Sequence, residues 1–458
     1  MEATDKKTIL ERIDTQRNYF ATGKSRDIAF RKEMLRRFRD AIIRNEKRIT
    51  DALYHDLHKS YQEAYLTEIS LVLSEISFHL SKLNRWAKPA RVKTPLFLLP
   101  SSSRLIHEPL GVSLIIAPWN YPFQLLMNPL VGAISAGCTA ILKPSPYTPA
   151  IAGVMEEIIS TTFKPEYITT VMGGREVNSF LLEQRWDIIF FTGSPVLGKV
   201  VMAAASKNLT PLVLELGGKS PCIVDEGADI GIAARRIAWG KTINAGQTCI
   251  APDYILVHGS LKEKLIEALG GEIRKTFGDD PGKSDWYPRM VSKGAFERVS
   301  GYISNGTVRF GGRTNAEAKY IEPTILDNID PASPVMQDEI FGPVLPVLTY
   351  NTVEEAIAFI NGREKPLALY FFGRKAMARE VLSRTSSGGG CLNDTLMHIT
   401  NHHMPFGGVG NSGMGSYHGK ESFLAFSNAR AIVKTPTWID MPFKYVPFKF
   451  FNLVRKIM

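Results

Sequence analysis

The chain has few cysteines and no long apolar segment. Its 458 residues include only Cys138, Cys222, Cys249 and Cys391. Their spacing fits neither a zinc site nor a disulfide framework, which predicts free thiols and no bound metal. No apolar run approaches the roughly 18 residues of a membrane span, and the N-terminus lacks the apolar core of a signal peptide. These absences favour a cytoplasmic protein.

The bulk composition is that of a globular protein with a basic surplus. Hydrophobic residues make up 44% and charged residues 22%, and a chain this long predicts two or three domains. Much of the net charge of +10 lies in residues 24–48, which predict one amphipathic helix. Because no nucleic-acid motif accompanies these charges, they favour a solvated helix face over a nucleic-acid partner. The apolar face of that helix would carry Phe30, Met34, Leu35, Phe38, Ile42 and Ile43.

The periodicity changes near residue 104. The first ninety residues predict helices, including a second apolar stripe from Leu66 to Leu80. Short apolar runs then alternate with helical segments, which indicates βαβ units and a parallel sheet. The expected strands are 112–117, 140–142, 168–171, 188–191 and 212–214, followed by 223–224 and 254–257 in a second α/β region.

Two predicted strand ends offer places for a ligand, although no GxGxxG follows a strand. The run Thr192-Gly193-Ser194-Pro195-Val196-Leu197-Gly198 is typical of a strand, a glycine turn and a helix start. Such a turn presents free backbone N–H groups to a phosphate, but a plain turn explains the same residues. Lys143 ends another strand, where ligands bind in open α/β sheets, or it is a surface lysine.

Two further segments carry groups suited to acyl chemistry. Cys249 follows Gly246-Gln247-Thr248, and Glu215 lies in Leu214-Glu215-Leu216-Gly217-Gly218-Lys219. A thiol and a separate base can run acyl transfer in two steps. Taken alone, a cysteine is more often a small buried hydrophobe, and the carboxylate could belong to a salt bridge.

Taken together, these segments resemble the aldehyde dehydrogenase superfamily. They occur in the family's order and cover most of the chain. The residues after Cys249 and the end of the last glycine-rich run resemble the class 3 group, which includes fatty aldehyde dehydrogenases. The segments that carry the resemblance are 117–123, 142–145, 191–194, 214–219, 246–249, 339–344 and 405–415.

The resemblance implies an α/β fold with three parts and a tail. Residues 1–83 and 107–214 would form a Rossmann-like NAD(P)-binding domain, and residues 215–398 an α/β catalytic domain. Residues 84–106 and 399–433 would form a small β-strand oligomerisation arm, and 434–458 a basic, aromatic C-terminal tail. The family is usually dimeric in this group, which implies a homodimer.

The resemblance also implies an activity and a set of site residues. The chain would oxidise medium- or long-chain aliphatic or aromatic aldehydes to carboxylic acids with NAD or NADP. Cys249 matches the nucleophile that forms a thiohemiacetal and then a thioester, Glu215 the general base, and Asn120 the oxyanion donor. Tyr65 and Tyr121 resemble residues of the substrate funnel. The residues matching cofactor contacts are Trp119, Lys143, Gly193, Ser194, Gly198, Gly217, Glu339 and Phe341.

Two features depart from the family pattern or leave alternatives open. Pro146 stands where many NAD-preferring members carry a glutamate that repels a 2′-phosphate, so we expect NADP to be tolerated, with Lys143 available to meet the phosphate. The tail interleaves aromatics with lysines, so it could make a weak contact with a membrane surface, pack across a dimer interface or cover the substrate mouth.

Two other activities compete with this interpretation. A CoA-acylating aldehyde dehydrogenase would pass the acyl group to CoA, but such enzymes typically lack the glutamate found at Glu215. A non-catalytic binding protein on the same fold would have been indicated by loss of Cys249, Glu215 or Asn120, and all three are present.

Overall fold

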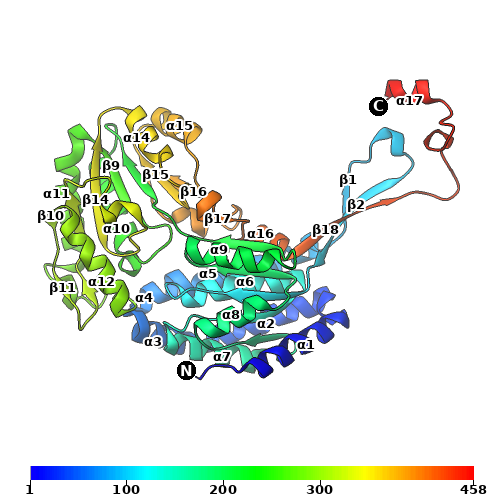
Figure 1. Cartoon of the computed structure of the whole chain (residues 1–458), viewed down its shortest axis with the longest axis horizontal. Coiled ribbons are helices and arrows are strands. Elements are labelled where there is room, and N and C mark those ends of the chain that lie inside the picture. The colour runs from blue at the N-terminus through cyan, green and yellow to red at the C-terminus, as the bar shows by residue number, and fades with distance from the viewer. Residues whose placement is uncertain (1, 458) are drawn as a thin grey trace.

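The computed structural model describes residues 2–457, which form two α/β layers and a projecting arm (Figure 1). Most of the helices cover the sheet faces, the last lies near the tip of the arm, and helices account for most of the first ninety residues. They are α1 (Lys6–Ala21), α2 (Ile28–Arg44), α3 (Glu46–Leu57), α4 (Tyr61–Ala64), α5 (Ser70–Trp86), α6 (Pro122–Ala136), α7 (Pro149–Thr162), α8 (Arg175–Glu183), α9 (Pro195–Ser206), α10 (Ile230–Thr242), α11 (Lys262–Phe277), α12 (Lys293–Gly301), α13 (Pro334–Gln337), α14 (Val353–Asn361), α15 (Lys375–Arg384), α16 (Lys420–Ala425) and α17 (Phe451–Ile457).

The first sheet is parallel except at one edge. Its strand order is β17-β7-β6-β3-β4-β5, and only β17 runs antiparallel to its neighbour. Helices on both faces bury the central strands completely, which is why these strands are continuous apolar runs. The strands are β3 (Val112–Ile116), β4 (Thr139–Lys143), β5 (Ile168–Thr170), β6 (Ile188–Thr192), β7 (Leu212–Glu215) and β17 (Gly413–Met414).

The chain order reverses between β3 and β6, which lie side by side although β4 and β5 separate them in sequence. In open α/β sheets such a switch point leaves a crevice beyond the carboxyl ends of the two strands. Trp119 and Asn120 follow β3, and Gly193 and Ser194 follow β6. The topology therefore brings four of the predicted site residues to one place.

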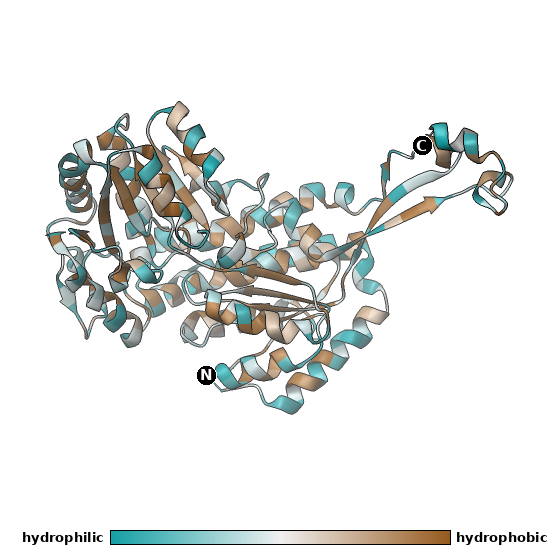
Figure 2. Ribbon diagram, turned by 45° about the horizontal axis from the view of Figure 1, so that its top comes forward, coloured by the Kyte–Doolittle hydropathy of each residue, from teal (hydrophilic) through white to brown (hydrophobic). Residues whose placement is uncertain are grey.

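The second sheet also has one antiparallel edge. Its order is β10-β13-β14-β9-β8-β15-β16, with β10 antiparallel to β13 and the other pairs parallel. Figure 2 shows the apolar strands of both layers and the more hydrophilic outer helices. The strands are β8 (Pro221–Val224), β9 (Tyr254–His258), β10 (Thr307–Phe310), β13 (Thr324–Asp327), β14 (Val344–Tyr350), β15 (Ala368–Phe372) and β16 (Gly389–Leu392); β11 (Thr314–Asn315) and β12 (Tyr320–Ile321) form a separate hairpin.

A three-stranded antiparallel sheet forms the arm, which extends away from both layers and carries the C-terminus near its tip (Figure 1). It contains β1 (Ala90–Val92), β2 (Ser102–Pro109) and β18 (Ser427–Lys434). β18 pairs with β2 along its whole length, from Ser427 opposite Pro109 to Lys434 opposite Ser102. No helix in the described part of the chain is both long and apolar enough to cross a membrane.

The strand predictions are confirmed, but two helix predictions are wrong in detail. The helix expected over 24–48 is interrupted twice, because Asp27 caps α2 and Asn45 separates it from α3. Ile43, expected on the buried face, is 52% exposed. Leu66 is 64% exposed because a π-helical turn over Tyr65–Ile69 inserts an extra residue before α5, which rotates the apolar face. The predicted domain boundaries stay a prediction.

Candidate active site

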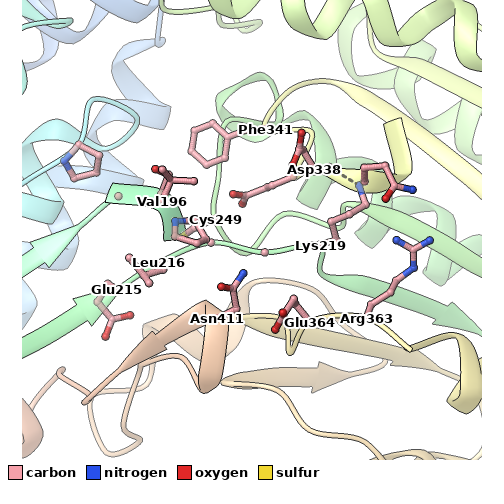
Figure 3. A pocket seen from close by; sticks show the side chains of 18 of the residues that line it. Val196, Glu215, Leu216, Lys219, Cys249, Asp338, Phe341, Arg363, Glu364 and Asn411 are labelled. Carbon is pink, nitrogen blue, oxygen red and sulfur yellow. Dashed lines mark hydrogen bonds between the residues drawn. The ribbon is translucent and has the colours of Figure 1, made fainter. Parts of the chain in front are cut away.

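A cavity of about 990 Å³ lies beyond the switch point, between the two sheets. Its lining includes residues after β3, after β6, around β7 and before β14. In the view of Figure 3, Cys249 lies between Phe341 and Leu216, while Lys219, Arg363 and Glu364 lie toward the other end. The predicted site residues that line this cavity are Trp119, Asn120, Gly193, Ser194, Glu215, Gly217, Cys249, Glu339 and Phe341.

Glu215 is a buried carboxyl group whose oxygens are free. It ends β7 and is 3% exposed, yet among the described residues neither of its carboxyl oxygens has a hydrogen-bond partner. Burial raises the pKa of Glu215 well above its usual value. A group in this state can hold or accept a proton near neutral pH, which suits a general base.

Cys249 is half-buried on the same cavity. Burial raises the pKa of its thiol, and the nearby carboxylates of Glu339 and Glu215 add to the effect. A raised pKa favours the thiol over the thiolate, so its proton must leave for it to act as a nucleophile.

The loop before Cys249 has an unusual backbone. Asn244, Ala245 and Gly246 all have φ between 51° and 73°, in the left-handed region. A Cβ at Gly246 would lie 2.3 Å from the carbonyl oxygen of Gly342, so only glycine fits there. Two consecutive non-glycine residues in this region cost free energy, and strain of this kind is concentrated at functional sites.

Asn120 is fixed by its side chain and by its carbonyl. Its Nδ2 donates to the Gln247 carbonyl at 3.0 Å, which joins it to the loop of Cys249. Its own carbonyl accepts from Asn244 Nδ2 at 2.8 Å. Gln247 in turn donates to the Asn244 and Arg289 carbonyls and accepts from Val291 N. One N–H of the Asn120 amide is thus engaged, and the second is available to a ligand in the cavity.

A fully buried ion pair, which the sequence did not indicate, supports this arrangement. Lys59 and Glu68 are both 0% exposed, and Lys59 Nζ donates to Glu68 Oε1 at 2.6 Å and to the Asn120 carbonyl at 2.9 Å. The second Glu68 oxygen accepts the backbone N–H groups of Phe123 and Gln124 at the start of α6. Lys59 also lies 4.0 Å from the ring centroid of Tyr121. No sequence periodicity predicts that Lys59 and Glu68 are buried, because their other partners lie in a segment distant in sequence.

Another part of the cavity wall combines an aromatic pair with an acidic group. Trp119 and Phe341 meet edge to face at 5.3 Å, although they come from different sheets. Phe341 has a φ of 49°, another left-handed non-glycine residue at this site. Burial raises the pKa of Glu339 to about 8. A Cβ at Gly217 would lie 2.2 Å from a Glu339 carboxyl oxygen, so glycine allows backbone and carboxylate to approach closely.

The remaining predicted residues lie elsewhere or act indirectly. Lys143 is 1% exposed, is absent from the cavity lining, and donates to the Pro144 carbonyl at 2.7 Å. Gly198 lies under Leu216, where a Cβ would come within 2.7 Å. Tyr65 begins the π-helical turn outside the cavity lining. Tyr121 is buried, and its hydroxyl lies 2.6 Å from Thr248 Oγ1, next to Cys249.

The glycine turn after β6 is partly engaged by protein groups. Gly193 N donates to the Glu215 carbonyl at 3.0 Å, and the Ser194 side chain accepts from Leu197 N as the N-cap of α9. The 12-residue α9 directs its N-terminus at the cavity, with Ser194, Pro195 and Val196 lining it. A helix start on an α/β switch point fits the phosphates of a dinucleotide.

Comparison with known proteins agrees with this architecture. The family model described as the aldehyde dehydrogenase family matches residues 1–432, so the chain belongs to that family. It is 48% identical over 434 residues to the 4,4'-diaponeurosporen-aldehyde dehydrogenase of Staphylococcus aureus, covering 94% of this chain and 95% of that one. It is 45% identical to the dimeric NADP-preferring aldehyde dehydrogenase of Canis lupus familiaris, covering 95% and 96%.

A solved structure shares the fold closely. The structure described as the substrate-bound state of Staphylococcus aureus AldH has a TM-score of 0.96 and 46% identity, covering 98% of this chain and 99% of that chain. The protein is therefore an oxidoreductase that oxidises aldehydes with NAD or NADP, by the cysteine chemistry general to this family.

Proposed function

We propose that Cys249, Glu215 and Asn120 are the nucleophile, the general base and the oxyanion donor of this oxidation. The observation that carries the proposal is that all three line one cavity, where neither carboxyl oxygen of Glu215 has a partner among the described residues. Buried polar groups are normally satisfied, so groups left open at a cavity are suited to a ligand.

The proposed reaction begins with attack of the Cys249 sulfur on the aldehyde carbon. Burial raises the pKa of the Cys249 thiol, so the thiol needs a base to lose its proton. Burial also raises the pKa of Glu215, which makes its carboxylate a stronger base, and it takes the thiol proton as the C–S bond forms. The free N–H of Asn120 Nδ2 and the backbone N–H of Cys249 then stabilise the oxyanion, and one such donor is typically worth about 3 kcal/mol of barrier.

Collapse of the oxyanion leaves a thioester on Cys249. A bound nicotinamide would supply the hydride acceptor that this step requires. Glu215 releases its proton, removes one from water, and the resulting hydroxide attacks the thioester carbon. The C–S bond breaks, the carboxylic acid departs, and the Cys249 sulfur leaves as a thiolate that takes the proton back from Glu215, which restores both groups.

We propose that the cofactor is held at the switch point. The open N-terminus of α9 would face its phosphates, Glu339 would accept hydrogen bonds from its nicotinamide ribose, and Trp119 and Phe341 would flank the ring. Pro146 is exposed and brings no carboxylate, so it supports use of NADP as well as NAD. A preference for NAD above 100-fold, roughly 2.7 kcal/mol, would contradict this part of the proposal.

We propose apolar aliphatic or aromatic aldehydes as the substrate class. The relative from Staphylococcus aureus takes its name from 4,4'-diaponeurosporen-aldehyde, and the apolar side chain of Leu125 lines the cavity together with Asn120. We also propose a homodimer joined by the arm, since a relative is named dimeric and β18 pairs with only β2 among the described strands.

A weak contact of the tail with a membrane surface is a further proposal. Trp438, Val446 and Phe450 are 76%, 79% and 65% exposed, and Lys444 and Lys449 lie between such residues. Truncation after residue 434 should reduce partitioning onto vesicles that contain anionic lipid. Unchanged partitioning would remove the idea.

The experiment that tests the main proposal is absorbance of the reduced nicotinamide with hexanal, decanal and benzaldehyde. Each aldehyde is run with NAD and with NADP, beside the Cys249→Ala variant. Turnover that disappears in the variant supports the assignment of Cys249. Turnover that requires added CoA would favour acyl transfer to CoA, and Cys249→Ala at wild-type rates would overturn the assignment.

A further inference from the structure

A second cavity, of about 510 Å³, lies where the arm meets the C-terminal end of α5. Its walls come from α5, β1, β2 and the chain after residue 401, so it is separate in sequence and in lining from the catalytic cavity. Phe78, Trp86 and Met404 give it an apolar side.

Positive side chains dominate the polar part of this cavity. Lys82, Arg85, Lys88 and Lys420 all line it, and Glu421 is the acidic group in its lining. Within residues 2–457 none of these four cations takes part in a salt bridge. Cations without carboxylate partners repel one another across a shared cavity, and this repulsion is relieved when an anion binds between them.

The floor of the cavity has an open polar group as well. His418 lines the cavity, is 3% exposed, and its Nε2 has no hydrogen-bond partner in the described part of the chain. Its backbone has a φ of 78°, and Gly419 next to it admits no side chain, since a Cβ there would lie 2.0 Å from the His402 carbonyl oxygen. The backbone holds His418 in place, with its unpartnered Nε2 buried.

A buried carboxylate that binds His402, one of the lining residues, is already engaged. Glu75 is fully buried and accepts from His402, Gly419 N and Ser422 Oγ, at 2.8, 2.7 and 3.0 Å. Burial alone would raise the pKa of Glu75, but the hydrogen bonds from His402 and His79 lower it. Its oxygens are therefore held by these donors, and among the described residues it forms no salt bridge with any of the four cations.

We propose that this cavity is a binding site for a phosphate-bearing anion. Arginine and lysine groups match the several oxygens of a phosphate, and Arg85 can bind two of them at once. The volume exceeds that of a bare phosphate, and the aromatic side would contact the group to which the phosphate is attached.

The first test is calorimetric titration of the enzyme with inorganic pyrophosphate at low salt, with NAD present at saturation. NAD occupies the cofactor site, and a parallel titration without NAD shows whether NAD, which also bears phosphates, competes at the second cavity. We expect saturable binding that weakens at least about tenfold in Arg85→Gln/Lys420→Gln. The matched control is Lys293→Gln, a change at an exposed lysine outside this cavity. The proposal would be overturned if the wild type showed no saturable binding. It would also be overturned if the double variant bound pyrophosphate as tightly as the wild type.

Two further measurements keep the result interpretable. Retained aldehyde turnover and an unchanged unfolding temperature show that the double variant is folded. Vesicles of phosphatidylcholine with and without phosphatidic acid identify the source of the phosphate. Capture by phosphatidic acid that pyrophosphate displaces supports a lipid headgroup, and pyrophosphate binding without vesicle capture supports a free phosphate compound.

Discussion

Two buried acidic groups near the catalytic cavity differ in how they are satisfied. Glu68 has an ammonium group and two backbone N–H groups as partners, while both oxygens of Glu215 are free among the described residues. Both side chains are almost completely buried. The difference shows that burial alone does not distinguish a structural carboxylate from a reactive one. The hydrogen-bond partners distinguish the two roles. A carboxylate whose oxygens are all hydrogen-bonded fixes the positions of its neighbours, whereas one without partners can exchange protons.

The strongest test of this comparison removes the nucleophile itself. In Cys249→Ala we expect turnover to fall at least about 10⁴-fold, because the thioester cannot form. Cys249 lines the cavity and packs against the core with only part of its surface, so the unfolding temperature should stay close to that of the wild type. Turnover is measured by nicotinamide absorbance and unfolding by calorimetry. A large loss of stability would show a structural role.

Glu215→Gln should separate activity from stability. We expect turnover to fall about 10²- to 10⁴-fold, because an amide cannot take the proton of water. The unfolding temperature should rise, because a carboxyl group without partners is costly to bury. A loss of stability in Glu215→Gln would mean that the carboxylate has a partner we have not identified.

Breaking the satisfied pair should have the opposite effect on stability. Glu68→Gln or Lys59→Met leaves one charge buried alone and should cost about 3–5 kcal/mol of unfolding free energy. The double change Lys59→Met/Glu68→Gln should cost less than the two single changes added together, since neither charge remains. Denaturant unfolding of all three proteins gives the coupling. Additive losses would contradict a direct interaction.

The pH dependence of stability should follow the raised pKa values. Burial raises the pKa of Glu339 to about 8 and that of Glu63 to about 7. Above the usual carboxyl pKa, the folded protein therefore binds more protons than the unfolded chain. The stability that Glu339 and Glu63 contribute is complete at acid pH and is lost as the pH rises toward 8. Unfolding temperatures between pH 5 and 9 should fall accordingly. Glu339→Gln should flatten that slope, whereas exposed Glu297→Gln should leave it unchanged.

The smallest effect concerns the cofactor. Lys143 is occupied by the Pro144 carbonyl, and Pro146 offers no carboxylate. Pro146→Glu should raise the preference for NAD over NADP by about tenfold in kcat/KM, through repulsion of the 2′-phosphate. Pro146→Gln, of similar size without the charge, is the control. An equal shift in both variants would exclude a role for charge.

Much of the fold followed from local pattern. The strands at 112–117, 188–191 and 212–214 were predictable because strands covered on both faces become unbroken apolar runs. The motif containing Cys249 was equally visible, because its residues are adjacent in sequence. The π-helical turn at Tyr65 was not predictable, since one extra residue in a helix leaves no signal in composition.

What the sequence by itself determined about this protein is its family, its two α/β layers and the identity of the groups that line the cavity. The tertiary structure alone decided which buried charges are satisfied. Lys59 meets the Asn120 carbonyl from 61 positions away, and Lys143 turns to its neighbouring carbonyl and not to the cavity. Such contacts depend on how segments pack in three dimensions. A hydrogen bond between distant segments leaves no periodic pattern in the sequence, so it cannot be predicted from the sequence alone.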